Sequence, residues 1–334
     1  MSLFSPQELK AAYPLSSRAR TFVEKSRMSA RNVLLGREKR LLIIAGPCSI
    51  HDLDSAHLYA DRFATLIKKV EKQCILLMRT YVEKPRTTVG WKGFLYDPYL
   101  NGTSAIAIGL KWTRQLFVEL AEREIPTATE FLEPIAAPFF EDLVTWGFIG
   151  ARTASSQIHR QLASLLSIPI GFKNSVSGYL DDAINGMIAA KHPHTFLHLS
   201  DEGKICVATS RGNPFSHLVL RGSETSTNCD AASISALQTR LRQMLLSPRI
   251  LVDCSHGNCQ KDYEKQRESF IGIMRQIQEG NSQIIGLMLE SHLQKGNQPL
   301  SASASKDISV TDPCLDWAST EELILSASAC CKSS

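Results

Sequence analysis

LLIIAGPCSIHDLDSAHLYADRFATLIKKVEKQCILLMRT, residues 41–80, is the stretch that decides the fold. It contains two short apolar runs, 41–46 and 75–80, with the length and composition of buried β-strands. Between them, apolar side chains recur at the spacing of one helix face: Tyr59, Phe63, Leu66, Ile67 and Val70. A strand, a helix and a second strand in this order predict two parallel strands joined by a crossover helix.

The same alternation continues along the chain. Further strand-like runs lie at 127–131, 148–152, 168–173, 194–199, 217–221, 249–253 and 284–289. Helical stripes separate several of them, for example at 180–188 and 234–245. This order predicts the α/β class and, within it, a (β/α)8 TIM barrel with a short amino-terminal extension.

The predicted strand-like runs number nine, which is one more than a barrel of eight strands needs. The segment DEGKICVATSRGNPFS, residues 201–216, has the pattern of a turn, a strand and a turn, without a helical stripe. We therefore expect an inserted β-hairpin near residues 199–216. The sequence leaves open whether 194–199 or 217–221 is the barrel strand.

Length and composition limit the domain organisation. A chain of 334 residues with 43% hydrophobic content can bury one large core. The expected parts are an amino-terminal extension at 1–35, the (β/α)8 catalytic barrel at 36–326 and a flexible tail at 327–334.

Charge and cysteine usage exclude several kinds of partner. The 37 basic and 33 acidic residues give a net charge of +4 without long blocks of one sign, which argues against nucleic acid and membrane surfaces as partners. The amino terminus lacks the apolar run of a secretory signal, and no other apolar run is long enough to cross a bilayer. Nine cysteines without zinc or disulfide spacing are typical of reduced thiols in a cytoplasmic protein.

Most of the predicted strands end in a polar or charged residue, and in a parallel barrel these ends meet on the face that carries active sites. The terminal residues are Cys48, Arg79, Glu130, Arg152, Lys173, Arg221, His256 and Glu290. Together with Lys84 and Arg86, the basic members would make a strongly positive pocket, which is costly unless anions occupy it. Arginine forks and lysine point charges suit a substrate with both phosphate and carboxylate groups, and two phosphorylated substrates would explain so many cations.

A second set combines a thiol, an imidazole and two carboxylates. Its members are Cys48, His256, Glu290 and Asp312. Such mixed soft and hard donors suit one divalent transition ion, Mn, Fe, Co or Zn, and not calcium. Spacing alone leaves open that Cys48 is a buried thiol and His256 a hydrogen-bonded core histidine.

Long motifs give the chain a resemblance to a known family. They are IAGPCSIHD (44–52), MRTYVEKPRTTVGWKG (78–93), ATEFLEP (128–134), GARTASSQIHRQLAS (150–164), PIGFKNSVSG (169–178), VLRG (219–222), LVDCSHGNCQK (251–261), LMLESHLQKGNQ (287–298) and SVTDPCLDW (309–317). In this order they resemble the 3-deoxy-D-arabino-heptulosonate 7-phosphate (DAHP) synthases of the microbial type I group. The block EKPRTTVGWKG separates these enzymes from the 3-deoxy-octulosonate 8-phosphate synthases.

The resemblance implies a cytoplasmic, metal-dependent transferase of the shikimate pathway that condenses phosphoenolpyruvate with erythrose 4-phosphate. It implies the metal ligands Cys48, His256, Glu290 and Asp312. Its phosphoenolpyruvate contacts correspond to Arg79, Lys84, Glu130, Ala151, Arg152, Lys173 and Arg221, and its sugar-phosphate contacts to Lys84, Pro85, Arg86 and Thr87. The residues expected to orient water or transfer protons are Lys84, Glu130, His256 and Asp312. Family members are commonly dimers or tetramers, so a homo-oligomer is expected.

The chain departs from the family pattern outside these positions. Ala154 and Ser155 stand where Thr-Glu is usual, and Pro134 replaces a residue common beside the family's regulatory pocket. Few residues precede the helix-like segment 16–35, so we do not expect feedback inhibition by phenylalanine or tyrosine to follow from the resemblance. The alternatives are a sister condensation that uses arabinose 5-phosphate or an amino sugar, and a catalytically silent barrel that binds metabolites.

Overall fold

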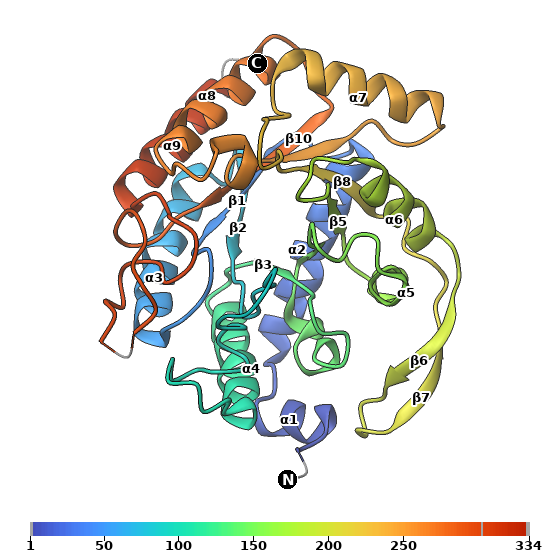
Figure 1. Cartoon of the computed structure of the whole chain (residues 1–334), viewed down its shortest axis with the longest axis vertical. Helices are drawn as coiled ribbons and strands as arrows, with labels where there is room; N and C mark the ends of the chain where they lie inside the picture. Colours follow the sequence, from blue (N-terminus) through green and yellow to red (C-terminus); the bar gives the residue numbers. More distant parts are fainter. Residues whose placement is uncertain (1–2, 302, 332–334) are drawn as a thin grey trace.

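The computed structural model describes residues 3–301 and 303–331. At its centre eight parallel strands form a closed barrel in the order β1-β10-β9-β8-β5-β4-β3-β2 (Figure 1). The strands are β1 (Leu41–Gly46), β2 (Cys74–Arg79), β3 (Thr127–Glu130), β4 (Trp146–Ile149), β5 (Ile170–Lys173), β8 (Ser216–Leu220), β9 (Ile250–Asp253) and β10 (Ile284–Glu290). The predicted (β/α)8 barrel is confirmed.

Helices surround the barrel (Figure 1). They are α3 (Leu53–Val70), α4 (Ile106–Glu122), α5 (Gln157–Leu165), α6 (Asp181–Lys191), α7 (Ala231–Gln243), α8 (Lys265–Gln278) and α9 (Trp317–Cys330). Between β3 and β4 two short 3-10 turns, η1 (Ala137–Phe139) and η2 (Glu141–Leu143), stand in place of an α-helix. No helix among the described residues is both long and apolar enough to cross a membrane.

The inserted hairpin is confirmed, and the structure decides which run belongs to the barrel. Strands β6 (Thr195–Leu199) and β7 (Ile205–Thr209) pair antiparallel as a separate two-stranded sheet. Strand β8 pairs with β5 and β9, so the barrel strand is the second of the two candidate runs. The hairpin therefore spans 195–209 and begins earlier than the predicted 199–216.

The amino-terminal extension consists of α1 (Pro6–Ala12) and α2 (Ser17–Leu35). Ser5 and Ser16 accept backbone N–H groups at the two helix starts, and α2 ends at Gly36 in the left-handed conformation. Helix α2 runs across the barrel in Figure 1, where its Ala30 and Val33 join the cluster of inward-facing barrel side chains. Helix α2 of the extension thus packs against side chains of the barrel interior.

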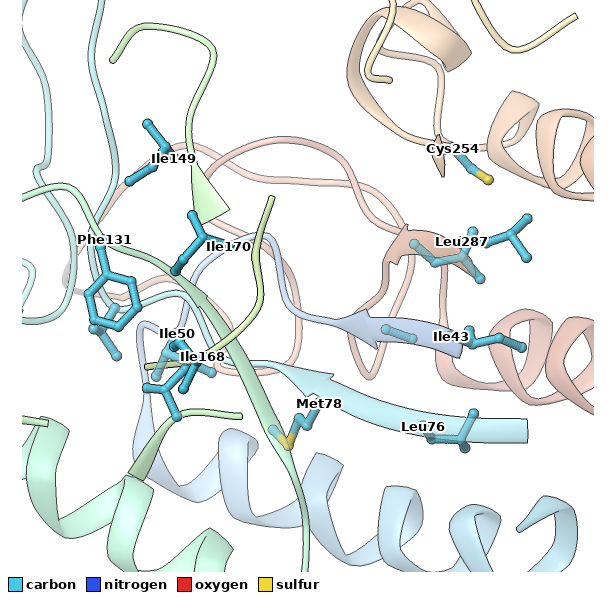
Figure 2. Close-up of a cluster of buried hydrophobic side chains, with 14 of the residues drawn as sticks. Ile43, Ile50, Leu76, Met78, Phe131, Ile149, Ile168, Ile170, Cys254 and Leu287 are labelled. Carbon is cyan, nitrogen blue, oxygen red and sulfur yellow. The ribbon is translucent and has the colours of Figure 1, made fainter. Parts of the chain in front are cut away.

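Alternate residues along the strands face two different layers. One layer packs against the helices, and Figure 2 shows part of it: Ile43, Leu76, Met78, Ile149, Ile170 and Leu287. The other fills the barrel interior and includes Leu42, Ile44, Leu77, Trp146, Phe148, Val219, Leu251 and Met288. Because both faces are covered, the strands are mostly apolar until their carboxyl ends. The exceptions are β3, with Thr127 and Thr129, and β8, which begins with Ser216 and His217.

The carboxyl-terminal boundary needs a correction. Helix α9 continues to Cys330, with Ala327 and Ser328 buried, so the flexible tail predicted from residue 327 does not begin there. The small residues of ASAC resemble a loop in composition, but they pack on the barrel's outer layer. Residues 332–334 lie outside the described residues.

Two helical glycines provide a matched test of this packing. A Cβ on Gly109 of α4 would overlap the backbone oxygen of Leu95, whereas a Cβ on Gly272 of α8 would meet nothing within 4 Å. We expect Gly109→Ala to lower the free energy of unfolding by about 2–3 kcal/mol. Gly272→Ala should raise it by about 0.5–1 kcal/mol, because alanine has the better helix propensity. Urea unfolding followed by circular dichroism measures both, and equal effects would contradict the packing described.

Candidate functional site

The inward-facing positions change from apolar to polar where the barrel strands end. Side chains two residues apart on a strand share a face, so each polar residue stands directly beyond an apolar core residue. Lys173 lies two residues beyond Gly171, and Arg221 lies two residues beyond Val219. Arg79, Glu130, Asp253 and Glu290 likewise lie two residues beyond an inward-facing apolar residue. The fold therefore gathers these polar groups at one end of the barrel.

Two glycines make room for them. A Cβ on Gly46 would overlap the backbone of Arg79, and a Cβ on Gly150 would overlap the carboxylate of Glu130. Gly46 also has a φ of 158°, which residues with a side chain rarely adopt, so the backbone conformation and the close approach of Arg79 both favour glycine there. These two positions let long side chains from the neighbouring strands lie across the barrel end.

The polar groups line a cavity of about 250 Å³. Every residue predicted to contact substrate lies on its wall: Arg79, Lys84, Pro85, Arg86, Thr87, Glu130, Ala151, Arg152, Lys173 and Arg221. His256, Glu290 and Asp312 line it too, whereas Cys48 is fully buried behind it. Residues far apart in the sequence are thus brought together around one space.

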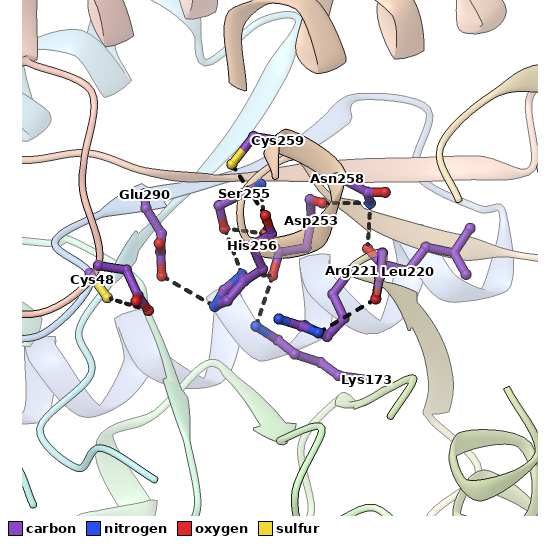
Figure 3. Close-up of polar contacts among 12 residues, drawn as sticks. Cys48, Lys173, Leu220, Arg221, Asp253, Ser255, His256, Asn258, Cys259 and Glu290 are labelled. Atoms are coloured by element: carbon purple, nitrogen blue, oxygen red, sulfur yellow. Dashed lines mark hydrogen bonds and ion pairs between the residues drawn. The ribbon is translucent and has the colours of Figure 1, made fainter. Parts of the chain in front are cut away.

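Cations in this wall are of two kinds. Carboxylates neutralise the first kind. The buried Glu290 lies 2.8 Å from Arg79, and the buried Asp253 lies 2.9 Å from Lys173 (Figure 3). Lys84 belongs to the same kind, with its Nζ 3.9 Å from Asp312 Oδ2. Among the described residues, no carboxylate lies within 4.0 Å of a charged nitrogen of the second kind, which comprises Arg86, Arg152, Arg221 and Lys261.

Arg221 shows what this lack of a partner means. It is only 8% exposed, and burial lowers the pKa of its guanidinium. A desolvated cation without a carboxylate partner is unfavourable unless an anion neutralises it. The cavity is therefore suited to an anionic ligand.

The loop after β2 brings further cations to the cavity. The Lys84 N–H donates to the carbonyl of Lys92 at 2.9 Å, and Arg86 Nε donates to the carbonyl of Trp91 at 2.7 Å. Arg152 Nε in turn donates to Thr87 Oγ1 at 3.0 Å. These contacts fold the loop back on itself and join it to the segment after β4.

Three of the four predicted metal ligands converge closely. Donor atoms of Cys48, Glu290 and Asp312 all lie within 4.8 Å of one another. The Cys48 Sγ donates to Asp312 Oδ2 at 3.5 Å and accepts from Lys84 Nζ at 3.1 Å. The fourth, His256, has its Nε2 3.5 Å from Glu290 Oε1.

The chemistry of this donor set fits a divalent ion. Burial, with the Glu290 carboxylate adding to it, raises the pKa of the Cys48 thiol to about 12. Such a thiol becomes a thiolate ligand when a divalent ion takes the place of its proton. Burial disfavours the charge of Lys84, but Cys48, Asp312 and Glu290 outweigh that effect and raise its pKa. One sulfur, one imidazole nitrogen and two carboxylates match a transition metal.

His256 is held in one orientation. Its backbone has a φ of 55°, and its Nδ1 lies 2.9 Å from Asp253 Oδ2 and 2.7 Å from Ser255 Oγ (Figure 3). A carboxylate on one ring nitrogen directs the other nitrogen toward a ligand, as is usual for metal-binding histidines. Here Nε2 is directed toward Glu290 and the cavity.

Sequence reasoning missed Asp253 and Tyr81. Asp253 is fully buried, and although burial opposes its charge, Lys173 and His256 hold its pKa well below the usual range. It lies within the quoted segment LVDCSHGNCQK and is the last residue of β9, which was the available signal. Tyr81 also lines the cavity, two residues beyond Arg79.

The fold and the cavity define a class of protein, the (β/α)8 barrel enzymes that handle phosphorylated anions at the carboxyl ends of their strands. A sequence model of the DAHP synthetase I family matches residues 9–325. The chain therefore belongs to the DAHP synthetase I family.

Known proteins agree with this assignment. The chain is 44% identical to the Tyr-sensitive phospho-2-dehydro-3-deoxyheptonate aldolase of Salmonella typhimurium, over 96% of this chain and 91% of that one. It is 43% identical to the Trp-sensitive enzyme of Escherichia coli, over 97% and 93%. The solved structure of phospho-2-dehydro-3-deoxyheptonate aldolase from Francisella tularensis superposes with a TM-score of 0.97 at 37% identity, covering 99% of this chain and 97% of that one. The resemblance and the DAHP synthase function predicted from the sequence are confirmed.

The role of Asp253 is open to a direct test. Asp253→Asn keeps the shape of the side chain but leaves Lys173 as a buried cation without a carboxylate. We expect the free energy of unfolding to fall by about 3 kcal/mol. The matched control is Asp61→Asn, which removes an exposed ion pair with Arg123. It should change the free energy of unfolding by less than about 1 kcal/mol. Denaturant unfolding of both variants measures these changes. An Asp253→Asn protein as stable as wild type would contradict the charge compensation described.

Proposed function

We propose that this chain condenses phosphoenolpyruvate with erythrose 4-phosphate and water to give DAHP and phosphate, using one divalent metal ion. The observation that carries the proposal is the cavity wall in which Arg86, Arg152 and Arg221 have no carboxylate partner among the described residues. Two phosphorylated substrates supply the anions that such a wall needs.

The metal is proposed to be held by Cys48, His256, Glu290 and Asp312. The close approach of three of their donor atoms and the orientation of the His256 ring support this assignment. Mn, Fe, Co and Zn all suit these donors. When bound, the ion supplies Lewis acidity toward the aldehyde oxygen of the sugar phosphate.

Phosphoenolpyruvate is assigned to the cations at the ends of β2, β5 and β8 and after β4. Arg79, Lys173 and Arg221 are almost fully buried, which strengthens their interaction with an anion because the local dielectric is low. Arg152 adds a planar fork, and the backbone of Ala151 lies beside it. These groups would neutralise the carboxylate and phosphate and fix the enol carbon.

Erythrose 4-phosphate is assigned to the loop after β2. Lys84, Pro85, Arg86 and Thr87 follow one another there and line the cavity. The Thr87–Arg152 hydrogen bond joins this loop to the segment assigned to phosphoenolpyruvate. The two substrates would thus lie side by side, as bond formation between the enol carbon and the aldehyde requires.

Water and protons are assigned to Lys84, Glu130, His256 and Asp312. Glu130 Oε1 is buried and has no hydrogen-bond partner among the described residues, so it is available to a water or hydroxyl group. His256 is hydrogen-bonded through Nδ1 to Asp253, which favours a role for Nε2. Water attacks C2 of the phosphoenolpyruvate portion, and the bond between C2 and the phosphate oxygen then breaks with loss of phosphate.

A cytoplasmic homo-oligomer, either a dimer or a tetramer, completes the proposal. All nine cysteines carry free thiols, which suits a reducing compartment. On the β6-β7 hairpin Leu197, Ile205 and Val207 are 73%, 80% and 68% exposed, and they project from one face of the two-stranded sheet. A second copy of the chain could cover this apolar face.

Phosphate release from the two substrates tests the function directly. Metal-stripped protein should be inactive, and Mn, Zn, Fe or Co should restore activity with erythrose 4-phosphate but not with arabinose 5-phosphate. Cys48→Ser should lower metal affinity by more than about 100-fold, since even the loss of an outer partner costs 10–100-fold. Cys206→Ser, on the hairpin, is the matched control and should behave as wild type. Full activity of the stripped protein would contradict the metal proposal.

A further inference from the structure

One aromatic ring contacts two of the cations in the cavity wall. The Cζ atom of Arg79 lies 3.7 Å from the centroid of the Tyr81 ring, and Lys173 Nζ lies 5.7 Å from the same centroid. Arg79 belongs to β2 and Lys173 to β5, so the ring connects two strands that β3 and β4 separate in the barrel. Tyr81 itself is 1% exposed and borders the cavity.

The ring lies against a surface of Arg79 that cannot form hydrogen bonds. The guanidinium Nε is a separate case, since it is buried and has no hydrogen-bond partner among the described residues. The edge of the guanidinium donates to the carbonyls of Pro47 and Cys48 and to Glu290 Oε1. The flat face has no donors, and here the Tyr81 ring covers it. Since Arg79 is fully buried, the negative face of an aromatic ring is a favourable surface for that cation.

The phenol oxygen of Tyr81, in contrast to the ring, contacts neither cation by a hydrogen bond. It is buried and lacks a hydrogen-bond partner among the described residues. A residue that served as an acid or as a substrate donor would present its hydroxyl to the cavity. The ring face, which contacts both cations, is therefore the part of Tyr81 to which the structure assigns a role.

We propose that Tyr81 is a positioning residue for phosphoenolpyruvate, whose ring face holds the Arg79 guanidinium and the Lys173 ammonium desolvated and aimed into the cavity. This inference rests on the proposed function. It assigns Arg79 the stronger dependence on Tyr81, because Arg79 lies closer to the ring and Lys173 also lies 5.4 Å from the centroid of Phe148.

Calorimetric titration with phosphoenolpyruvate is the test, because it does not depend on turnover. Tyr81→Phe keeps the ring and should bind within about twofold of wild type. Tyr81→Leu removes the ring face and should weaken binding about tenfold, as expected for a desolvated cation–π contact. Phe117→Leu is the matched control, since it removes a fully buried ring that stacks on Phe140 in the outer layer, and it should leave the affinity unchanged.

A second series separates the ring's charge distribution from its shape. Phenylalanine and its mono-, di- and trifluoro derivatives, placed at position 81, weaken the negative ring face stepwise at nearly constant size. The Kd for phosphoenolpyruvate should rise with each fluorine, and the thermal midpoint should fall with it, because the ring face also stabilises the buried Arg79 in the free protein. A Kd that stays the same across the series would overturn the inference and leave Tyr81 as a residue of core packing.

The two proposals fail in different ways. Wild-type protein that binds phosphoenolpyruvate but releases no phosphate with erythrose 4-phosphate would contradict the proposed reaction, and the fluorine series would still decide the role of Tyr81. An active enzyme whose Kd stays the same across the fluorine series would contradict only the inference about Tyr81. Wild-type protein without affinity for phosphoenolpyruvate would overturn both.

Discussion

The buried ion pair between Arg79 and Glu290 is the contact on which the cavity depends. Its two side chains are 0% and 1% exposed, and they join β2 to β10 across β1. Removing either partner would leave an uncompensated charge in a low dielectric, at about 3–5 kcal/mol. The same pair belongs to both halves of the site, because Glu290 is a candidate metal ligand and Arg79 a candidate substrate contact. The metal half and the anion half are thus built as one structure.

Asp253, at the end of the neighbouring strand β9, repeats this arrangement. It pairs with Lys173 in the anion half and with His256 in the metal half. Each half therefore supplies the counter-charges that make burial of the other tolerable. Arg86, Arg152 and Arg221 are left for the substrates. The distribution of paired and unpaired cations explains how the wall is stable and still able to bind highly charged ligands.

Much of this was accessible from the sequence, because a parallel barrel brings its strand ends together. The runs ending near Arg79, Lys173 and Arg221 were sufficient to predict a positive cavity. The choice between β6 and β8 was not accessible, since both are short apolar runs and only pairing with β5 separates them. Tyr81 and Asp253 were missed for a similar reason: their importance lies in contacts with residues from other strands. The end of α9 was misjudged because small residues resemble a loop until they are seen packed.

The most direct measurement is anomalous diffraction from crystals grown with Mn²⁺ and phosphoenolpyruvate. The account predicts one strong anomalous peak within about 2.0–2.5 Å of donor atoms of Cys48, His256, Glu290 and Asp312. It also predicts phosphoenolpyruvate density against Arg79, Lys173 and Arg221. A manganese peak remote from these four residues, or substrate bound elsewhere, would contradict the central claim that one barrel end holds both.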